Sequence, residues 1–284
     1  MPQTRPFSQP SFPTVRQPPR PRQLKEVRKH RSFASLRAIG ALILREMQTS
    51  HGRGRGSYLW AIMEPVGGIV LLTLIFSVGF RAPPIGSNFA IFYATGMIPF
   101  MTYMDVSGKV SGAITYSKPL LAYPAVTFMD ALIARIVFNA VTQVVVAIIV
   151  FTGILVTMET RTDPQIGGIA VGMLMALVLG TGVGVINCFL FQAFAWWQSV
   201  WGILMRPLFL LSGLFFIFDE VPQPYQDWLW WNPLIHVVGQ TRRSFFAGYS
   251  GDYVSHAYLF GLGMGLTALG LGLLIRYHRD LQYS

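Results

Sequence analysis

The chain has 284 residues, of which 12% are charged and 52% are hydrophobic, and it carries a net charge of +10. A soluble domain has about twice that share of charged residues, so most of the apolar surface must face lipid or neighbouring helices. The basic charge does not indicate a nucleic-acid-binding protein, because Lys and Arg gather in one segment instead of covering a folded face. Residues 1–59 hold 12 Lys/Arg against Glu26 and Glu46, and the rest of the chain is neutral.

The amino-terminal segment differs from the rest of the chain. Residues 1–32 are rich in Pro and Arg and contain no apolar run, so we expect a disordered tail. Because positive charge stays on the cytoplasmic side of a membrane, this tail is expected to be cytoplasmic. Residues 33–284 are expected to form one transmembrane domain.

An amphipathic helix is predicted between Phe33 and Thr49. Most of its apolar residues share one arc at 100° per residue, with Leu42 as the exception, while Arg45 and Glu46 lie mostly opposite. A basic amphipathic helix just before a span lies naturally in the membrane interface.

Six apolar tracts follow, each near or above the roughly 20 residues that a bilayer requires. The predicted spans are Trp60–Phe80, Phe89–Val106, Val126–Met158, Ile166–Leu190, Ser199–Phe218 and Val254–Ile275. Six spans place both termini in the cytoplasm, with 16 Lys/Arg inside and 4 outside. The fold class expected is an all-α integral membrane protein.

Two pairs of glycines have the spacing that lets transmembrane helices approach closely. Gly180 and Gly184 are four residues apart, as are Gly261 and Gly265. The outer segment Asp219–Gly251 is too polar to span a bilayer, and it contains several Trp and Pro residues. It is expected to form short re-entrant helices before the last span, with Trp at the headgroup level.

Sequence patterns typical of enzymes are absent from the chain. The five His residues are scattered, no metal-ligand spacing occurs, and no phosphate-binding glycine loop with its Lys is present. We therefore expect no catalytic residue, metal or cofactor in this chain, which shows no means of its own to hydrolyse ATP.

Four ionisable residues lie at membrane depth in this scheme, namely Glu64, Asp130, Arg135 and Arg206. Such residues are costly and are usually paired or functional. Glu64 and Asp130 lie close to the cytoplasmic boundary, so both also fit ordinary interfacial charges. Arg206 lies eight residues into the fifth span, so it either lines a passage for anionic groups or bonds the carbonyls of a neighbouring helix.

A series of motifs in this order resembles the membrane subunit of capsular polysaccharide exporters, in the type-two export branch of ATP-binding-cassette transporters. The similarity covers about residues 33–284. The residues that carry it are Leu44-Arg45-Glu46, Tyr58 to Pro65, Asp130 with Ala134-Arg135, Arg206 to Phe209 with Ser212, Trp231 to Val238, Arg242, and Gly248-Tyr249. The chain differs from the family at Gly239, where the family often has Glu.

The resemblance implies a bacterial inner-membrane permease. It implies a homodimer, two ATPase subunits, a lipid-linked polysaccharide as cargo, a periplasmic adaptor and an outer-membrane channel. Residues expected along the substrate passage are Arg206, Glu64, Phe209, Phe215 and Trp231. Residues expected to couple to the ATPase are Lys118, Pro119, Leu120, Leu121, Arg45 and Glu46.

Other functions remain open at this point. The same fold would suit an exporter of another lipid-linked glycan or of a small amphiphile. A membrane enzyme acting on lipid-linked sugars would need a cluster of carboxylates or His at one membrane face, and no such cluster is visible. A scaffold without cargo would show no stimulation of an ATPase by substrate.

Overall fold

The computed structural model describes residues 34–49, 57–121 and 127–283, and the predicted disordered tail lies outside these residues. The described part of the chain is helical and contains no strand. Its helices are α1 (Ala34–Thr49), α2 (Ser57–Gly79), α3 (Phe89–Ser111), α4 (Ala113–Leu121), α5 (Phe128–Thr157), α6 (Ile166–Ala193), α7 (Trp197–Leu210), η1 (Phe218–Glu220), α8 (Tyr225–Trp230), α9 (Pro233–Phe245) and α10 (His256–Tyr283).

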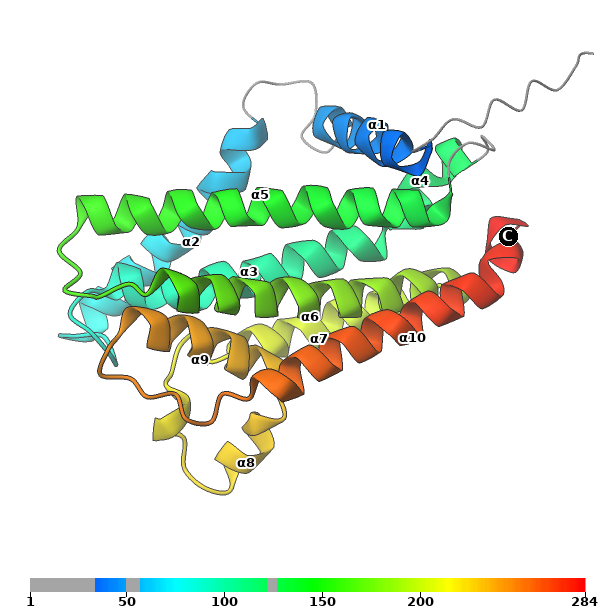
Figure 1. Ribbon diagram of the computed structural model, residues 1–284. Coiled ribbons are helices and arrows are strands. Elements are labelled where there is room, and N and C mark those ends of the chain that lie inside the picture. The colour runs from blue at the N-terminus through cyan, green and yellow to red at the C-terminus, as the bar shows by residue number, and fades with distance from the viewer. Residues whose placement is uncertain (1–33, 50–56, 122–126, 284) are drawn as a thin grey trace, which may run out of the picture. The chain divides into compact units, whose positions relative to one another are not determined.

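The helices α3 and α6 form the centre of the bundle. α6 packs most extensively against α3 and α10, and α9 packs against both α6 and α3 (Figure 1). Most of α3 is buried, including Phe92, Tyr93 and Tyr103. A helix that is buried in this way is held by protein on nearly every side, so its polar residues need not face lipid.

Glycines allow these central helices to approach one another. A Cβ on Gly180 would lie 3.1 Å from the carbonyl oxygen of Tyr103, and one on Gly184 would lie 3.0 Å from that of Ser107. The prediction for this pair is therefore confirmed, with α3 as the partner.

The prediction for the second glycine pair is wrong. Nothing lies within 4 Å of a Cβ placed on Gly261 or Gly265. Gly263 and Gly270 make the close approach instead, and a Cβ on Gly270 would lie 2.8 Å from the amide nitrogen of Ile186. The i, i+4 spacing alone did not show which face of α10 meets α6.

Four described helices are long and apolar enough to cross a membrane: Leu59–Gly79, Phe128–Thr157, Ile166–Ala193 and His256–Tyr277. The predicted span Ser199–Phe218 is not one continuous helix. α7 has 14 residues, which at about 1.5 Å per residue is shorter than the ~30 Å hydrocarbon core. The chain leaves the helix after Leu210 and turns at Gly213, whose φ of +79° favours glycine.

The helix α1 confirms the predicted amphipathic element but packs through only part of the predicted apolar face. Leu42 and Glu46 are buried, and Ile39 and Ile43 join Leu42 in a small cluster on α5. Leu44, in the middle of the predicted apolar arc, is 62% exposed. One edge of the predicted apolar arc, at Ile39 and Ile43, therefore packs on α5 beside Leu42 and Glu46, while Leu44 and Met47 of the same arc are exposed.

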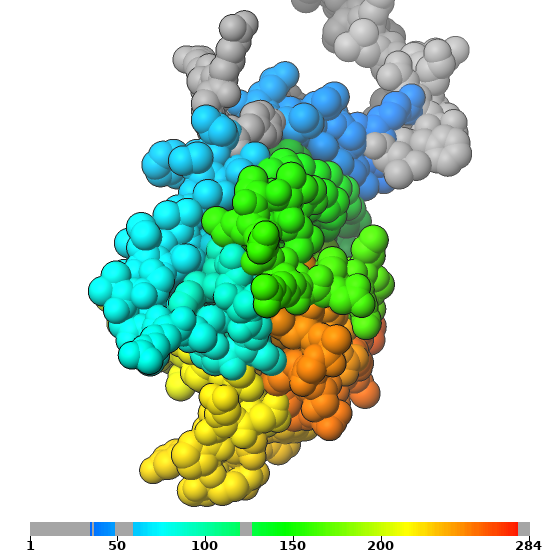
Figure 2. All heavy atoms as spheres, turned by 90° about the vertical axis from the view of Figure 1, so that its left-hand side faces the viewer, coloured from blue at the N-terminus to red at the C-terminus, as the bar shows by residue number. Residues whose placement is uncertain are grey.

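One end of the bundle is formed by loops that are tied to each other. The hydroxyl of Ser87 in the α2–α3 loop donates to the carbonyl of Thr160 in the α5–α6 loop at 3.2 Å. The amide of Gln165 donates to the carbonyl of Ser244 in α9 at 2.8 Å. Figure 2 shows these segments together on one face, with the yellow segment that contains α8 projecting beside them.

Candidate functional site

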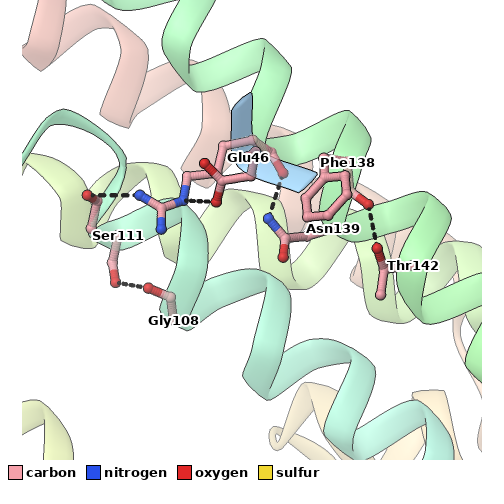
Figure 3. A network of polar contacts seen from close by, with 8 residues as sticks. Glu46, Gly108, Ser111, Phe138, Asn139 and Thr142 are labelled. Atoms are coloured by element: carbon pink, nitrogen blue, oxygen red, sulfur yellow. Dashed lines mark hydrogen bonds and ion pairs between the residues drawn. The ribbon is translucent and has the colours of Figure 1, made fainter. Parts of the chain in front are cut away.

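A buried ion pair lies at the opposite end of the bundle, where α1, α4 and α5 meet. The guanidinium Nε of Arg135 lies 3.2 Å from a carboxylate oxygen of Glu46, and both side chains are less than one-tenth exposed. Arg135 also donates from Nη1 to the carbonyl of Gly112 at 3.1 Å. Figure 3 shows Glu46, Ser111 and Asn139 gathered in this network.

The guanidinium of Arg135 joins the network to α4. Its carbon lies 4.2 Å from the centroid of the Tyr116 ring, and the guanidinium of Arg45 lies 5.3 Å from the same ring. Cations over an aromatic face are attracted by the negative charge on that face. α1 and α4 are therefore fixed to the first turns of α5 through one arginine.

The residues predicted to couple to an ATPase lie on these two helices. Arg45 and Glu46 are on α1, and Lys118, Pro119, Leu120 and Leu121 form the last residues of α4. Lys118 and Pro119 are exposed. The predicted coupling residues on α1 are far apart in sequence from those on α4. The contacts of Arg135 and Tyr116 bring the two helices together.

Asp130, which was open between an interfacial and a functional charge, has a structural role in α5. Its carboxylate accepts hydrogen bonds from the amide and the hydroxyl of Thr127, and the Thr127 hydroxyl accepts from the Asp130 amide. This reciprocal capping box satisfies free donors at the start of the helix.

A groove of about 580 Å³ lies between α3 and α7. We call it the α3–α7 groove. Its walls carry aromatic and methionine side chains, a serine and a glycine on the α3 side, a glycine on the α7 side, and one cation. The lining residues are Phe100, Met104, Ser107, Gly108, Trp201, Gly202, Met205, Arg206 and Phe209.

Four phenylalanines continue from this groove toward α2, and we call them the aromatic row. The ring of Phe100 meets that of Phe209 at 5.2 Å, and Phe209 meets Phe215 at 5.4 Å, both edge to face. Phe215 then stacks on Phe76 of α2 at 6.0 Å. Aromatic faces and edges of this kind also suit the apolar CH groups of sugars.

The structure brings together three of the five predicted passage residues. Arg206 and Phe209 line the α3–α7 groove, and Phe215 contacts Phe209. Glu64 and Trp231 do not line this groove. Glu64 is exposed on α2, and Trp231 contacts Trp230 and Tyr258 near the start of α10.

The guanidinium of Arg206 is exposed and forms no hydrogen bond or ion pair with another described residue. Within one copy of the chain it therefore does not bond the carbonyls of a neighbouring helix. Arg206 lines the groove, and the fork of N–H donors of an arginine is suited to a carboxylate or phosphate.

Sequence reasoning missed the contacts of two arginines. Arg135 was noted only as a charge at membrane depth, and its partner Glu46 was placed on a polar, exposed face. Arg242 was counted among outer charges, yet it is 2% exposed. For Arg135 a signal was available, because a single arginine among mostly apolar helix neighbours must find partners within the protein. For Arg242 the signal was weaker, because Arg243 follows it directly and polar residues surround it.

The glycine at position 239 has a local steric reason. A Cβ there would collide with the phenol oxygen of Tyr253 and lie 2.8 Å from its ring carbon. Tyr253 is also held by the hydroxyl of Tyr249 at 3.0 Å. The space for a longer side chain is therefore filled by this tyrosine pair.

A helical bundle with four described helices long and apolar enough to cross a membrane is the architecture of an α-helical membrane protein. The profile of the ABC-2 type transporter family matches residues 37–246. The chain belongs to this family.

Several characterised proteins are similar over most of their length. The polysialic acid transport protein KpsM of Escherichia coli is 31% identical over 235 residues, which cover 83% of this chain and 91% of KpsM. The capsule polysaccharide export inner-membrane protein CtrC of Neisseria meningitidis is 24% identical, covering 91% and 99%. BexB of Haemophilus influenzae, which has the same description, is 26% identical, covering 87% and 93%.

Proposed function

We propose that this chain is the permease subunit of an ATP-driven exporter that moves a polysaccharide across the bacterial inner membrane. One observation carries the proposal: the similarity to proteins named for capsule polysaccharide export or polysialic acid transport extends over nearly the whole of both chains. The chain itself acts as a translocation pathway and not as an enzyme. The cargo is a polysaccharide that is linked to lipid.

The chain crosses the membrane six times in this proposal. The four long apolar helices provide four crossings. α3, with 23 residues, provides another, because it is long enough to span and most of its polar residues are covered by protein. The sixth crossing is made by α7 together with the turn that follows it. The helices α8 and α9 enter the outer leaflet and leave it on the same side, as re-entrant helices. Both termini are then cytoplasmic.

A second copy of the chain completes the passage. α7 has no buried residue, and Ile203, Leu204 and Leu210 are 47–65% exposed. α2 exposes a similar apolar face, with Leu71 and Leu74 at 58% and 60%. We place the passage at the axis of a homodimer, where two α3–α7 grooves face one another and the aromatic row offers stacking surfaces to sugar rings.

Two separate ATPase subunits drive transport by binding to α1 and α4. The ion pair between Glu46 and Arg135 makes these helices one platform on α5, so a displacement of α4 is transmitted to a transmembrane helix. The exposed end of α4 is short enough to enter a groove on a partner. ATP and magnesium remain on that partner, and a periplasmic adaptor and an outer-membrane channel receive the polymer.

Transport by purified components tests this function. The permease and its ATPase are reconstituted in vesicles, and uptake of lipid-linked polysaccharide is measured with ATP and with a non-hydrolysable analogue. ATP-dependent uptake of the polymer is expected. Uptake only of a small amphiphile or of another lipid-linked glycan would favour those alternative cargoes, cleavage of the glycan would indicate an enzyme, and an ATPase insensitive to cargo would indicate a scaffold.

A further inference from the structure

The turn that follows α7 exposes backbone carbonyls that no helix satisfies, and α9 with its cap supplies the donors. The Asn232 side chain donates to the carbonyl of Leu211 at 2.8 Å. Arg242 donates from Nη2 to Leu214 at 2.9 Å and from Nη1 to Phe216 at 2.7 Å. Non-helical backbone at membrane depth requires such partners, since lipid provides none.

Arg242 is built into this position on every side. Its guanidinium carbon lies 4.2 Å from the centroid of the Phe92 ring. A Cβ on Gly96 would lie 3.5 Å from Nη2 and 3.3 Å from the Cα of Leu214, so the glycine leaves room for both groups.

The two carbonyls that Arg242 holds flank Phe215 directly in the sequence. The backbone on both sides of Phe215 is therefore fixed, and its ring is directed between Phe76 of α2 and Phe209 of α7. A lysine could satisfy one of these carbonyls but lacks the planar fork that reaches both. The position of the Phe215 ring thus depends on a side chain 27 residues away in sequence.

We infer that Arg242 is a positioning residue that keeps the outer end of the α3–α7 groove closed by holding Phe215 in the aromatic row. This inference rests on the proposed function, because it treats the groove as part of the passage. The ring of Phe215 joins Phe76 of α2 to Phe209 of α7 and so closes the groove at this end. Arg242 holds the ring there in the resting protein. Loss of the fork leaves two buried carbonyls without donors, so the turn rearranges and the ring moves.

The test measures access to the groove in intact cells that produce neither the partner ATPase nor the polysaccharide. Gly202 lines the groove, and nothing lies within 4 Å of a Cβ placed there, so Gly202→Cys is a reporter that the fold tolerates. It is introduced into the full chain with Cys188→Ala, which removes the buried native thiol. A membrane-impermeant maleimide is then added from outside to intact cells.

Arg242→Gln is expected to speed labelling of the reporter about tenfold, as is Phe215→Ala, and the two together are expected to add nothing further. Ten-fold corresponds to about 1.4 kcal/mol. Arg242→Lys is expected to give an intermediate rate. Arg243→Gln is the matched control, because the neighbouring arginine does not hold the turn and lies instead 3.5 Å from His256.

Three results would overturn the inference. Labelling in Arg242→Gln or, if that variant does not insert, in Arg242→Lys could equal that of the parent. The effects of Arg242→Gln and Phe215→Ala could be additive, or neither could expose the reporter. Because no cargo is present, these outcomes are independent of the proposed function, which fails instead if vesicles show no ATP-dependent glycan uptake while labelling behaves as expected.

Discussion

Three arginines of the bundle have their charge stabilised in three different environments. Arg135 is paired with a carboxylate, Arg242 is bound to two carbonyls, and Arg206 is exposed in a groove without a described partner. A buried charge whose partners are all within the fold is expected to act on structure. The arginine without such partners is the one available to a ligand.

Replacing Arg206 is expected to affect transport and not folding. Arg206→Ala should abolish export of an acidic polymer at normal membrane abundance, because the groove loses its cation. Arg206→Lys should restore only part of the export, since a point charge replaces the two-point fork. Export is measured as surface polysaccharide per unit of permease. An equal fall of abundance and export in Arg206→Ala would instead assign Arg206 a structural role in the dimer.

Replacing Glu46 is expected to destabilise the protein strongly. Glu46→Ala leaves the buried guanidinium of Arg135 without its carboxylate, a change that typically costs about 3 kcal/mol or more. The midpoint of thermal unfolding in detergent should fall, while Gln48→Ala, at an exposed position of the same helix, should leave it unchanged. If both variants unfold at the parent's temperature, the ion pair does not fix α1 to α5.

At the scale of elements, α1 and α4 are the parts of the bundle that we propose bind an ATPase. We expect Leu120→Asp with Leu121→Asp to stop copurification of the ATPase, because two carboxylates at the end of α4 oppose insertion into an apolar groove. Thr115→Asp, at an exposed position earlier in α4, serves as the control and should retain the partner. A complex that survives the double substitution would place the contact elsewhere.

The bounds of helices that depend on their own hydropathy could be predicted from the sequence. The structure of segments that depend on side chains distant in the sequence could not. The bounds of α2 and α6 lie within three residues of the predicted spans at both ends. The fifth span was predicted too long, because its apolar run continues past Leu210 while its helix does not. The side chain that stabilises the non-helical remainder, Arg242, lies in a different element, and hydropathy does not report such a contact.

The candidate site was predictable to a similar extent. Arg206, Phe209 and Phe215 could be selected because a charge and aromatics stand out in an apolar tract. The burial of Glu46 could not, since helical periodicity places it among polar residues. Its position depends on Arg135, which belongs to another helix, and pairing between helices is set by their packing.

At the scale of the whole molecule, the proposed topology predicts where reagents reach the chain. A cysteine at Asp227, exposed on α8, should react with an impermeant maleimide added outside intact cells. A cysteine at Lys118, exposed on α4, should react only after the cells are broken. Labelling of position 118 in intact cells would contradict the six-span arrangement with both termini inside.

The contact between Arg242 and the turn after α7 also bears on how the protein is made. The carbonyl of Leu214 is synthesised 28 residues before the guanidinium that satisfies it. Until α9 emerges from the ribosome, α7 is too short to span, and its turn has carbonyls that would be left bare in lipid. We therefore expect that α7 does not leave the insertion machinery as a separate span, and that the segment from α7 to α9 enters the bilayer as a single unit of biogenesis.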